Sequence, residues 1–188
     1  GAIQKLENAS KKIINFYINH YYNKKEIIVC GCLPSIDSDL RNIKGIVCLG
    51  PNELNLFEYF FKYKIKIKNI NGNVSATMIN NVYPKNEYFI QVCTGCINNC
   101  SYCVIKRAKG FVISKHLKKV IEEFKAGLQL GFKNFTLLAD DFSSYGLDIS
   151  TNFSDLLNKI DKIKGEYKIS IPYFGPHNLE LFFPKINK

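Results

Sequence analysis

Four of the seven cysteines in this 188-residue chain lie within residues 93–103, CTGCINNCSYC. The last three, Cys96, Cys100 and Cys103, are spaced Cys-x3-Cys-x2-Cys, and Cys93 adds a Cys-x2-Cys in front of them. Thiolates this close together in the sequence can hold a metal centre. Their number decides the chemistry, because four ligands close a site, whereas three on an iron–sulfur cluster leave one iron open to a substrate.

Two four-thiolate sites remain as alternatives. A structural zinc site usually pairs two Cys-x2-4-Cys knuckles across a longer spacer, so the gap between Cys96 and Cys100 is cramped for zinc. The bacterial ferredoxin run has a different order of gaps. Cys93 ends a predicted strand, and we expect its sulfur to point away from the loop or into the core, as free cysteines often do. The spacing therefore favours three ligands over zinc or a four-thiolate cluster.

Three segments resemble a known family. GCINNCSYCVIKRAKG (95–110) is similar to the cysteine loop of radical S-adenosylmethionine enzymes, with an aromatic residue before the last cysteine. LLADDFSSYGLDISTNFSDLL (137–157) resembles the methylthiotransferases that modify tRNA, and its YGLDISTN is close to the archaeal and eukaryotic branch acting on N6-threonylcarbamoyladenosine. VCGCLPS (29–35) matches the end of that family's N-terminal domain. The resemblance covers most of the chain.

The resemblance implies that Cys96, Cys100 and Cys103 bind three irons of a [4Fe–4S] cluster, whose fourth iron takes S-adenosylmethionine. Reductive cleavage of that cofactor would give a radical that removes a hydrogen from C2 of the modified adenosine, before sulfur and a methyl group are transferred. Cys32 would be the last of three ligands to an auxiliary cluster. Since no cysteine precedes Cys30, we expect this second [4Fe–4S] cluster only if the missing cysteines are supplied from elsewhere. No side chain is predicted to be catalytic, because the cofactor carries the hard chemistry.

The candidate cofactor-binding residues are Asp140, Asp141 and Tyr102. Related enzymes place a carboxylate or amide near the methionine ammonium, where a charge-assisted hydrogen bond forms. Side chains alternate along a strand, so we expect only one aspartate, Asp140, to face the site. The alternative is that one of them caps a turn. The Tyr102 ring is expected to pack over the cluster or the adenine, or else in the core.

Three basic residues, Lys106, Arg107 and Lys109, follow the last cysteine of the loop. They are candidates for binding tRNA phosphates, and short basic runs also occur simply as solvated surface. The formal net charge of +10 would assist binding to a polyanion, although lysine is frequent throughout the chain. The expected partners are therefore tRNA and an electron donor, and the sequence leaves the oligomeric state open.

Hydrophobic periodicity predicts a series of helices and short buried strands that position these residues. The predicted helices are 5–20, 53–63, 114–131 and 153–163, and the predicted strands are 25–32, 45–50, 87–93, 134–141 and 167–173. Asn52 is expected to cap the helix at 53–63. Ser114 is a possible N-cap of the helix at 114–131, and Gly131 is expected to end it. Cys30 and Cys48 fall in two of the predicted strands and are expected to be buried.

This order predicts an α/β fold with parallel sheets. We expect the C-terminal part of a small parallel α/β domain at 1–63, a linker at 64–86, and the first half of a radical SAM domain, an incomplete (β/α) barrel, at 87–188. Ligands sit at the carboxyl ends of parallel strands, so the cysteine loop, the two aspartates and His177 should share one rim. The family extends further on both sides, and the chain resembles a middle segment.

No apolar run reaches the roughly 18 residues of a membrane span, and clustered cysteines favour a metal in a reducing compartment, so a cytoplasmic location is expected. The sequence-based hypothesis is a radical SAM tRNA methylthiotransferase of the threonylcarbamoyladenosine type, without a membrane partner. Two alternatives remain: a non-catalytic Fe–S or zinc module that binds RNA, and a methylthiotransferase with another target, such as a ribosomal protein.

Overall fold

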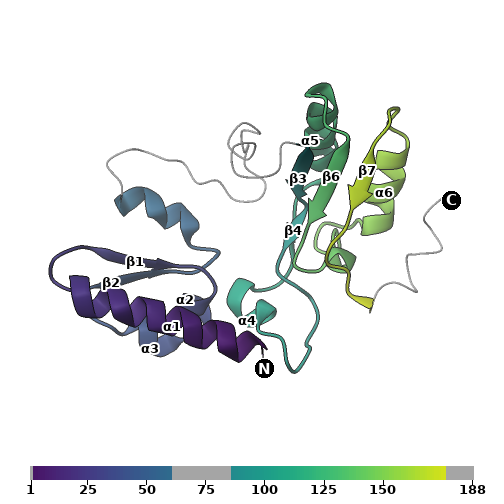
Figure 1. The fold of residues 1–188 in the computed structure, drawn as a ribbon. Coiled ribbons are helices and arrows are strands. Elements are labelled where there is room, and N and C mark those ends of the chain that lie inside the picture. Colours follow the sequence, from purple (N-terminus) through teal and green to yellow (C-terminus); the bar gives the residue numbers. More distant parts are fainter. Residues whose placement is uncertain (1, 61–85, 177–188) are drawn as a thin grey trace. The chain divides into compact units, whose positions relative to one another are not determined.

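The computed structural model describes residues 2–60 and 86–176, and it is mixed α/β with parallel sheets (Figure 1). The α/β class predicted from the sequence is confirmed. Two compact units are present: the N-terminal unit contains residues 2–60 and Cys100–Lys109, and the C-terminal unit contains residues 86–99 and 110–176. The predicted linker, apart from residue 86, and His177 lie outside the described residues. No helix in the described ranges has the length and apolar character needed to cross a membrane.

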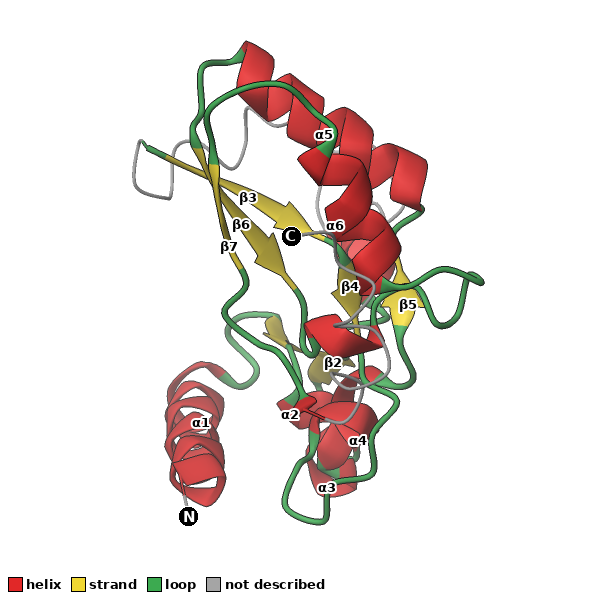
Figure 2. Cartoon of the chain, turned by 90° about the vertical axis from the view of Figure 1, so that its right-hand side faces the viewer, coloured by secondary structure: helices red, strands yellow, loops and turns green. Residues whose placement is uncertain are grey.

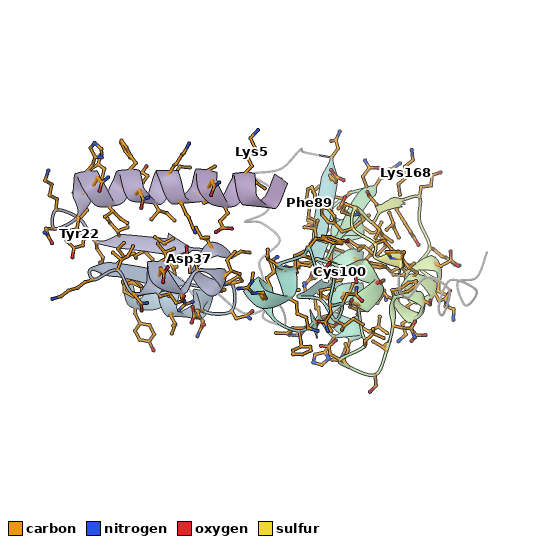
Figure 3. The ribbon with its side chains drawn as sticks, turned by 90° about the horizontal axis from the view of Figure 1, so that it is seen from below. Lys5, Tyr22, Asp37, Phe89, Cys100 and Lys168 are labelled. Atoms are coloured by element: carbon orange, nitrogen blue, oxygen red, sulfur yellow. The ribbon has the colours of Figure 1, made fainter. Side chains whose placement is uncertain are left out.

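The N-terminal unit is built on two parallel strands. Its elements are α1 (Ala2–Tyr21), β1 (Ile27–Cys30), α2 (Leu33–Ile36), α3 (Ser38–Arg41), β2 (Ile46–Leu49), a 3-10 helix (Leu54–Phe60) and α4 (Ile105–Lys109). The strands pair in register from Ile27 with Ile46 to Cys30 with Leu49. Parallel strands need a crossover, which α2 and α3 supply. Figure 3 shows α1 alongside the strands, with the Lys5 side chain pointing away from them.

The short helices α2 and α3 were not predicted, because four residues are too few to show a helical period. Local chemistry explains both. Pro34 lies in the first turn of α2, where its missing N–H costs nothing. The carboxylate of Asp37 accepts hydrogen bonds from the N–H groups of Asp39 and Leu40 and so caps α3.

The α-helix predicted after Asn52 is wrong over its described part, where Leu54–Phe60 form a 3-10 helix. The Asn52 amide donates instead to the Lys109 carbonyl oxygen at 3.0 Å. The neighbouring Glu53 carboxylate is held by Arg41 at 2.6 Å and by the Gly50 N–H at 2.6 Å. These tertiary contacts fix the start of this segment.

The prediction that Cys30 is buried is also wrong, because its side chain is exposed, and Cys48 is only half-buried. Cys30 is the last residue of β1, and the chain turns away from the strand at Gly31, which has a φ of +119°. In the described residues this sheet has two strands only, so few neighbouring residues cover Cys30 at the end of β1.

The C-terminal unit is built on three parallel strands in the order β3-β6-β7. Its elements are β3 (Glu87–Gln91), β4 (Cys93–Thr94), β5 (Ile113–Ser114), α5 (Leu117–Gln129), β6 (Asn134–Leu138), a 3-10 helix (Phe142–Ser144), α6 (Phe153–Asp161) and β7 (Lys168–Ser170). In Figure 2, α5 and α6 lie on the same face of this sheet. The alternation of strands and helices predicted from the sequence is confirmed for this unit.

The core of this unit lies between the sheet and its two helices. Alternate strand residues are buried, including Tyr88 and Ile90 of β3, as expected when one face of a strand packs on a core. Gly127 lets α5 approach the sheet closely, because a Cβ at this position would lie 2.6 Å from the Phe135 ring. The fully buried side chains include Val120, Phe124, Leu137, Leu156 and Ile160.

Two predicted boundaries differ from the structure near the cysteine loop. The strand predicted at 87–93 breaks at Val92, after which β4 pairs with β5 in antiparallel fashion, Cys93 opposite Ser114. Ser114 therefore lies in a strand rather than at a helix cap, and α5 begins at Leu117. The Ser114 hydroxyl accepts the Gly146 N–H at 2.9 Å, which commits it to another contact. Gly131, with a φ of +87°, follows α5 as predicted.

Candidate functional site

Cys93, the first cysteine of the loop, belongs to the core. Its side chain is 0% exposed, and the thiol donates to the backbone carbonyl oxygen of Asp141, with an Sγ–O distance of 3.7 Å. Burial, and secondarily the charges of Asp140 and Asp141, raises the pKa of this thiol well above its usual value. The predicted inward orientation of the Cys93 sulfur is confirmed. A thiol held in this way is a poor metal ligand, because the thiolate is the form that binds metal.

Gly95 turns the chain from β4 into the loop. Its φ is +76°, a left-handed conformation that glycine adopts at little cost. Its N–H donates to the Asp140 carboxylate at 2.9 Å. A Cβ at Gly95 would collide with the backbone carbonyl of Phe111, which lies just before β5. The start of the loop is thus packed directly against another backbone segment.

Cys96 is the one of the three predicted ligands that lies in the C-terminal unit, and it is half-buried. Its sulfur accepts the Asn98 backbone N–H at 3.4 Å and lies 3.7 Å from the Asp141 carboxylate. Burial raises the pKa of the Cys96 thiol, whereas the Asn98 N–H acts in the opposite direction. Hydrogen bonds to cysteine sulfur are one means by which proteins tune iron–sulfur clusters.

Both aspartates that follow β6 reach the cysteine loop. Asp140 accepts the Gly95 N–H, and Asp141 accepts the Asn98 side-chain amide at 2.8 Å. Both contacts are possible because β6 ends at Leu138 and strand alternation ends with it. The alternative that one of the two aspartates caps a turn is confirmed for Asp141, which is the N-cap of the 3-10 helix Phe142–Ser144. Burial alone would raise the pKa of Asp141, but hydrogen bonds from Ser143, Ser144 and Gly175 leave it below its ordinary value.

The recognisable stretch after Asp141 supports the strand pair at the base of the loop. The Tyr145 hydroxyl is buried and donates to the Lys115 carbonyl oxygen at 3.0 Å. The Gly146 N–H donates to the Ser114 hydroxyl, and the Ser114 N–H donates to the Asp148 carboxylate at 2.8 Å. These contacts hold β5, and β5 in turn holds β4 and Cys93.

The other two predicted ligands lie in the N-terminal unit. Cys100 and Cys103 are both half-buried, and the Cys103 N–H donates to the Cys100 carbonyl oxygen at 3.1 Å, which closes a turn. Tyr102, between them, is 79% exposed, so the core-packing alternative for its ring is excluded. The negative charge of Cys100 raises the pKa of the Tyr102 hydroxyl.

The predicted RNA-binding residues form most of α4, which follows Cys103. Arg107 is exposed, whereas Lys106 and Lys109 are half-buried. Ala108 is the buried residue of this short helix. Cys32 is exposed and directly precedes α2.

The structure brings together Cys96, Asp140 and Asp141, whereas Cys100 and Cys103 belong to the other unit. In residues 2–60 and 86–176, no three His, Cys, Asp or Glu side chains are grouped closely enough to hold a metal ion. Sequence reasoning missed Asn98, Ser144 and Gly175, which surround Asp141. Only the serine carried a signal, because Ser residues directly after Asp are typical of a side-chain-capped turn.

Comparison with known proteins supports the resemblance read from the cysteine loop. A Methanocaldococcus jannaschii protein named "Probable threonylcarbamoyladenosine tRNA methylthiotransferase" is 30% identical over 98% of this chain and 44% of its own length. A protein of the same name from Pyrococcus horikoshii is 28% identical over 87% of this chain and 40% of its own. "Ribosomal protein uS12 methylthiotransferase RimO" of Carboxydothermus hydrogenoformans is 36% identical over 48% of this chain and 21% of its own.

No family model matches this chain. The chain spans less than half the length of the curated relatives that it matches. The predicted resemblance is nevertheless confirmed, because four relatives matched over 86–98% of the chain carry the name of the enzyme type suggested by the motifs. The chain is therefore homologous to the methylthiotransferases, and along most of its length it matches those named for threonylcarbamoyladenosine in tRNA.

Proposed function

We propose that this chain provides the cysteine loop of a radical S-adenosylmethionine methylthiotransferase that converts N6-threonylcarbamoyladenosine in tRNA to its 2-methylthio derivative. The observation that carries the proposal is the difference among the four cysteines of the loop. Cys93 is fully buried in the core, whereas Cys96, Cys100 and Cys103 are half-buried. Three partly exposed thiols and one buried thiol are the donor set that a cluster with an open iron requires.

The residues fit a [4Fe–4S] cluster by their chemistry. Thiolate is the usual ligand of such clusters, and the sulfur of Cys96 already accepts one backbone N–H. When bound, the cluster and S-adenosylmethionine supply the one-electron chemistry that cleaves the sulfonium bond. The protein residues would bind and orient these groups. Cys96, Cys100 and Cys103 would hold three irons, and an external electron donor would be required.

In this proposal Asp140 and Tyr102 are the cofactor-binding residues. The Asp140 carboxylate lies at the carboxyl end of the parallel sheet, where α/β proteins bind ligands, and it is only partly buried. It would accept the methionine ammonium of the cofactor through a charge-assisted hydrogen bond. The exposed Tyr102 ring would cover the cluster or the adenine.

The proposal assigns the remaining candidates to RNA and to a second cluster. Lys106, Arg107 and Lys109 would bind tRNA phosphates, in a salt-dependent manner. Exposed Cys32 would bind an auxiliary [4Fe–4S] cluster if two further cysteines came from outside this chain. The parallel sheet β3-β6-β7 would be the first half of a (β/α) barrel, following an N-terminal domain at 1–63 and a linker at 64–86.

A second candidate function is methylthiolation of another target, such as a ribosomal protein. The observation in its favour is the similarity to RimO proteins named for ribosomal protein uS12, one over about half of this chain and another, from Dictyoglomus thermophilum, over 87% of it at 29% identity. The relatives named for threonylcarbamoyladenosine match 86–98% of the chain at 27–30% identity, so coverage alone does not separate the two targets. The resemblance of the segment YGLDISTN to the threonylcarbamoyladenosine branch is the reason that tRNA is the favoured target.

Mass spectrometry of tRNA nucleosides tests the target. Cells that lack the gene should lose 2-methylthio-N6-threonylcarbamoyladenosine and accumulate the precursor without sulfur, because C2 of the adenosine is no longer modified. The natural gene should restore the nucleoside, and a Cys100→Ser gene should not. An unchanged nucleoside level in the deletion strain, with an altered mass of a ribosomal protein, would transfer the proposal to the second candidate.

A further inference from the structure

We propose that Asp141 is a positioning residue that fixes the first half of the cysteine loop through the side chain of Asn98, rather than a residue that binds the cofactor. The consequence for iron binding rests on the function proposed above. The structural part of the inference concerns the C-terminal unit alone, since Asp141, Asn98 and Cys96 all lie in it.

Oxygen Oδ1 of Asp141 joins two segments of the chain. It accepts the Ser143 backbone N–H at 3.0 Å and the Ser143 hydroxyl at 2.7 Å, as a turn-capping aspartate does. It also accepts the Gly175 N–H at 2.8 Å, from the segment after β7. Gly175 leaves room for this contact, because a Cβ there would lie 2.8 Å from Oδ1 itself.

Oxygen Oδ2 of the same carboxylate faces the cysteine loop. It accepts the Asn98 side-chain amide at 2.8 Å and the Ser144 hydroxyl at 2.8 Å. The Cys96 sulfur lies 3.7 Å from it. A turn cap needs only the contacts to Ser143 and Ser144, so the bond to Asn98, 43 residues earlier in the chain, is an additional connection.

These contacts leave little capacity for a ligand on Asp141. A carboxylate has about four lone-pair sites, and five close N–H and O–H donors already share those of Asp141. Its side chain is also buried, with the residue 5% exposed. All partners of the Asp141 side chain are hydrogen-bond donors, so an ionised carboxylate satisfies them. An asparagine at this position would point its own N–H groups at some of these donors. Asp140 therefore remains the candidate for the cofactor ammonium.

Three variants of the full chain separate positioning of the loop from capping of the turn. Asn98→Ala removes the amide bond to Asp141 but keeps the backbone N–H that Cys96 accepts. Asp141→Asn keeps the shape of the side chain and changes its hydrogen-bonding character. Ser143→Ala is the matched control, because it removes a hydroxyl donor from the other oxygen of the same carboxylate.

Hydrogen exchange of the metal-free protein, followed by mass spectrometry, is the first measurement. Asn98→Ala and Asp141→Asn should speed exchange in the peptide spanning 94–99 by about ten-fold or more, the loss expected for a hydrogen bond to a charged group. Exchange in strand β3 should stay unchanged for Asn98→Ala. Ser143→Ala should leave the 94–99 peptide within about two-fold of the natural protein. Equal effects of Asn98→Ala and Ser143→Ala on this peptide would overturn the inference.

Iron content after anaerobic reconstitution is the second measurement. Asn98→Ala should bind less iron than Ser143→Ala at equal thermal stability, and the conservative Asn98→Ser should recover part of the difference. Equal iron in the two alanine variants would contradict the role in the site. Failure of the natural protein to bind iron would refute the proposed function, whereas the exchange result would still decide whether Asp141 positions the loop.

Discussion

A Cys100→Ser protein is expected to lose nearly all site-bound iron after anaerobic reconstitution with iron and sulfide. Three thiolates hold the proposed cluster, and a serine hydroxyl is a much weaker ligand for iron than a thiolate. Cys100 is half-buried, so the substitution leaves no large cavity and should change the free energy of unfolding little. Iron per chain, measured after removal of unbound metal, should fall from about four to near zero.

Cys93→Ser is the matched control, from the same loop and with the same change of atom. Because Cys93 lies in the core, we expect its serine variant to keep its iron while losing about 1–3 kcal/mol of unfolding free energy from burial of a hydroxyl. Urea titration measures the stability. Loss of iron from Cys93→Ser at temperatures where it remains folded would show that the buried sulfur is a ligand and that the three-ligand assignment is wrong.

Gly95→Ala is expected to be the most damaging single-methyl change near the loop. It combines a left-handed conformation, φ +76°, with a collision between the new Cβ and the Phe111 carbonyl. The conformational part costs about 1–2 kcal/mol. The collision involves backbone on both sides and cannot be relieved by a side-chain rotation, so we expect a total above about 4 kcal/mol. The shift should also weaken the bond from the Gly95 N–H to Asp140 and lower the iron content.

Gly131→Ala isolates the conformational part of this effect. Gly131 has a φ of +87°, and a Cβ there would meet no atom within 4 Å. Its alanine variant should therefore lose only about 1–2 kcal/mol and bind iron normally. Urea denaturation of both variants measures the difference. Equal losses for Gly95→Ala and Gly131→Ala would mean that β4 and the segment before β5 are not packed as closely as the structure shows.

The sequence predicted the regular elements well where a repeating pattern was long enough to read. The apolar spacing of Val120, Phe124 and Leu128 placed α5, and buried runs placed β3 and β6. Predictions failed where tertiary contacts decide local structure. Ser114 has the residue type of an N-cap, but its hydroxyl is bound to the Gly146 N–H from a distant loop.

Of the candidate site, only the spacing of the cysteines along the sequence and the orientation of Cys93 were predictable. The four cysteines lie within residues 93–103, and the extended conformation expected at Cys93 predicted that its sulfur points away from the loop or into the core. The bond between Asn98 and Asp141 spans 43 residues, and the bond between Asp141 and Gly175 spans 34. No local pattern encodes such pairs, since their partners are chosen by how β6 and the segment after β7 are packed.

The central claim is that three thiolates leave one iron open to S-adenosylmethionine. The most direct measurement is electron paramagnetic resonance of the reconstituted, dithionite-reduced chain with and without the cofactor. We predict the signal of a reduced [4Fe–4S] cluster, with g values that shift when S-adenosylmethionine is added, because the cofactor coordinates an iron. A reduced cluster whose spectrum is unchanged by saturating cofactor, or zinc as the bound metal, would contradict the claim.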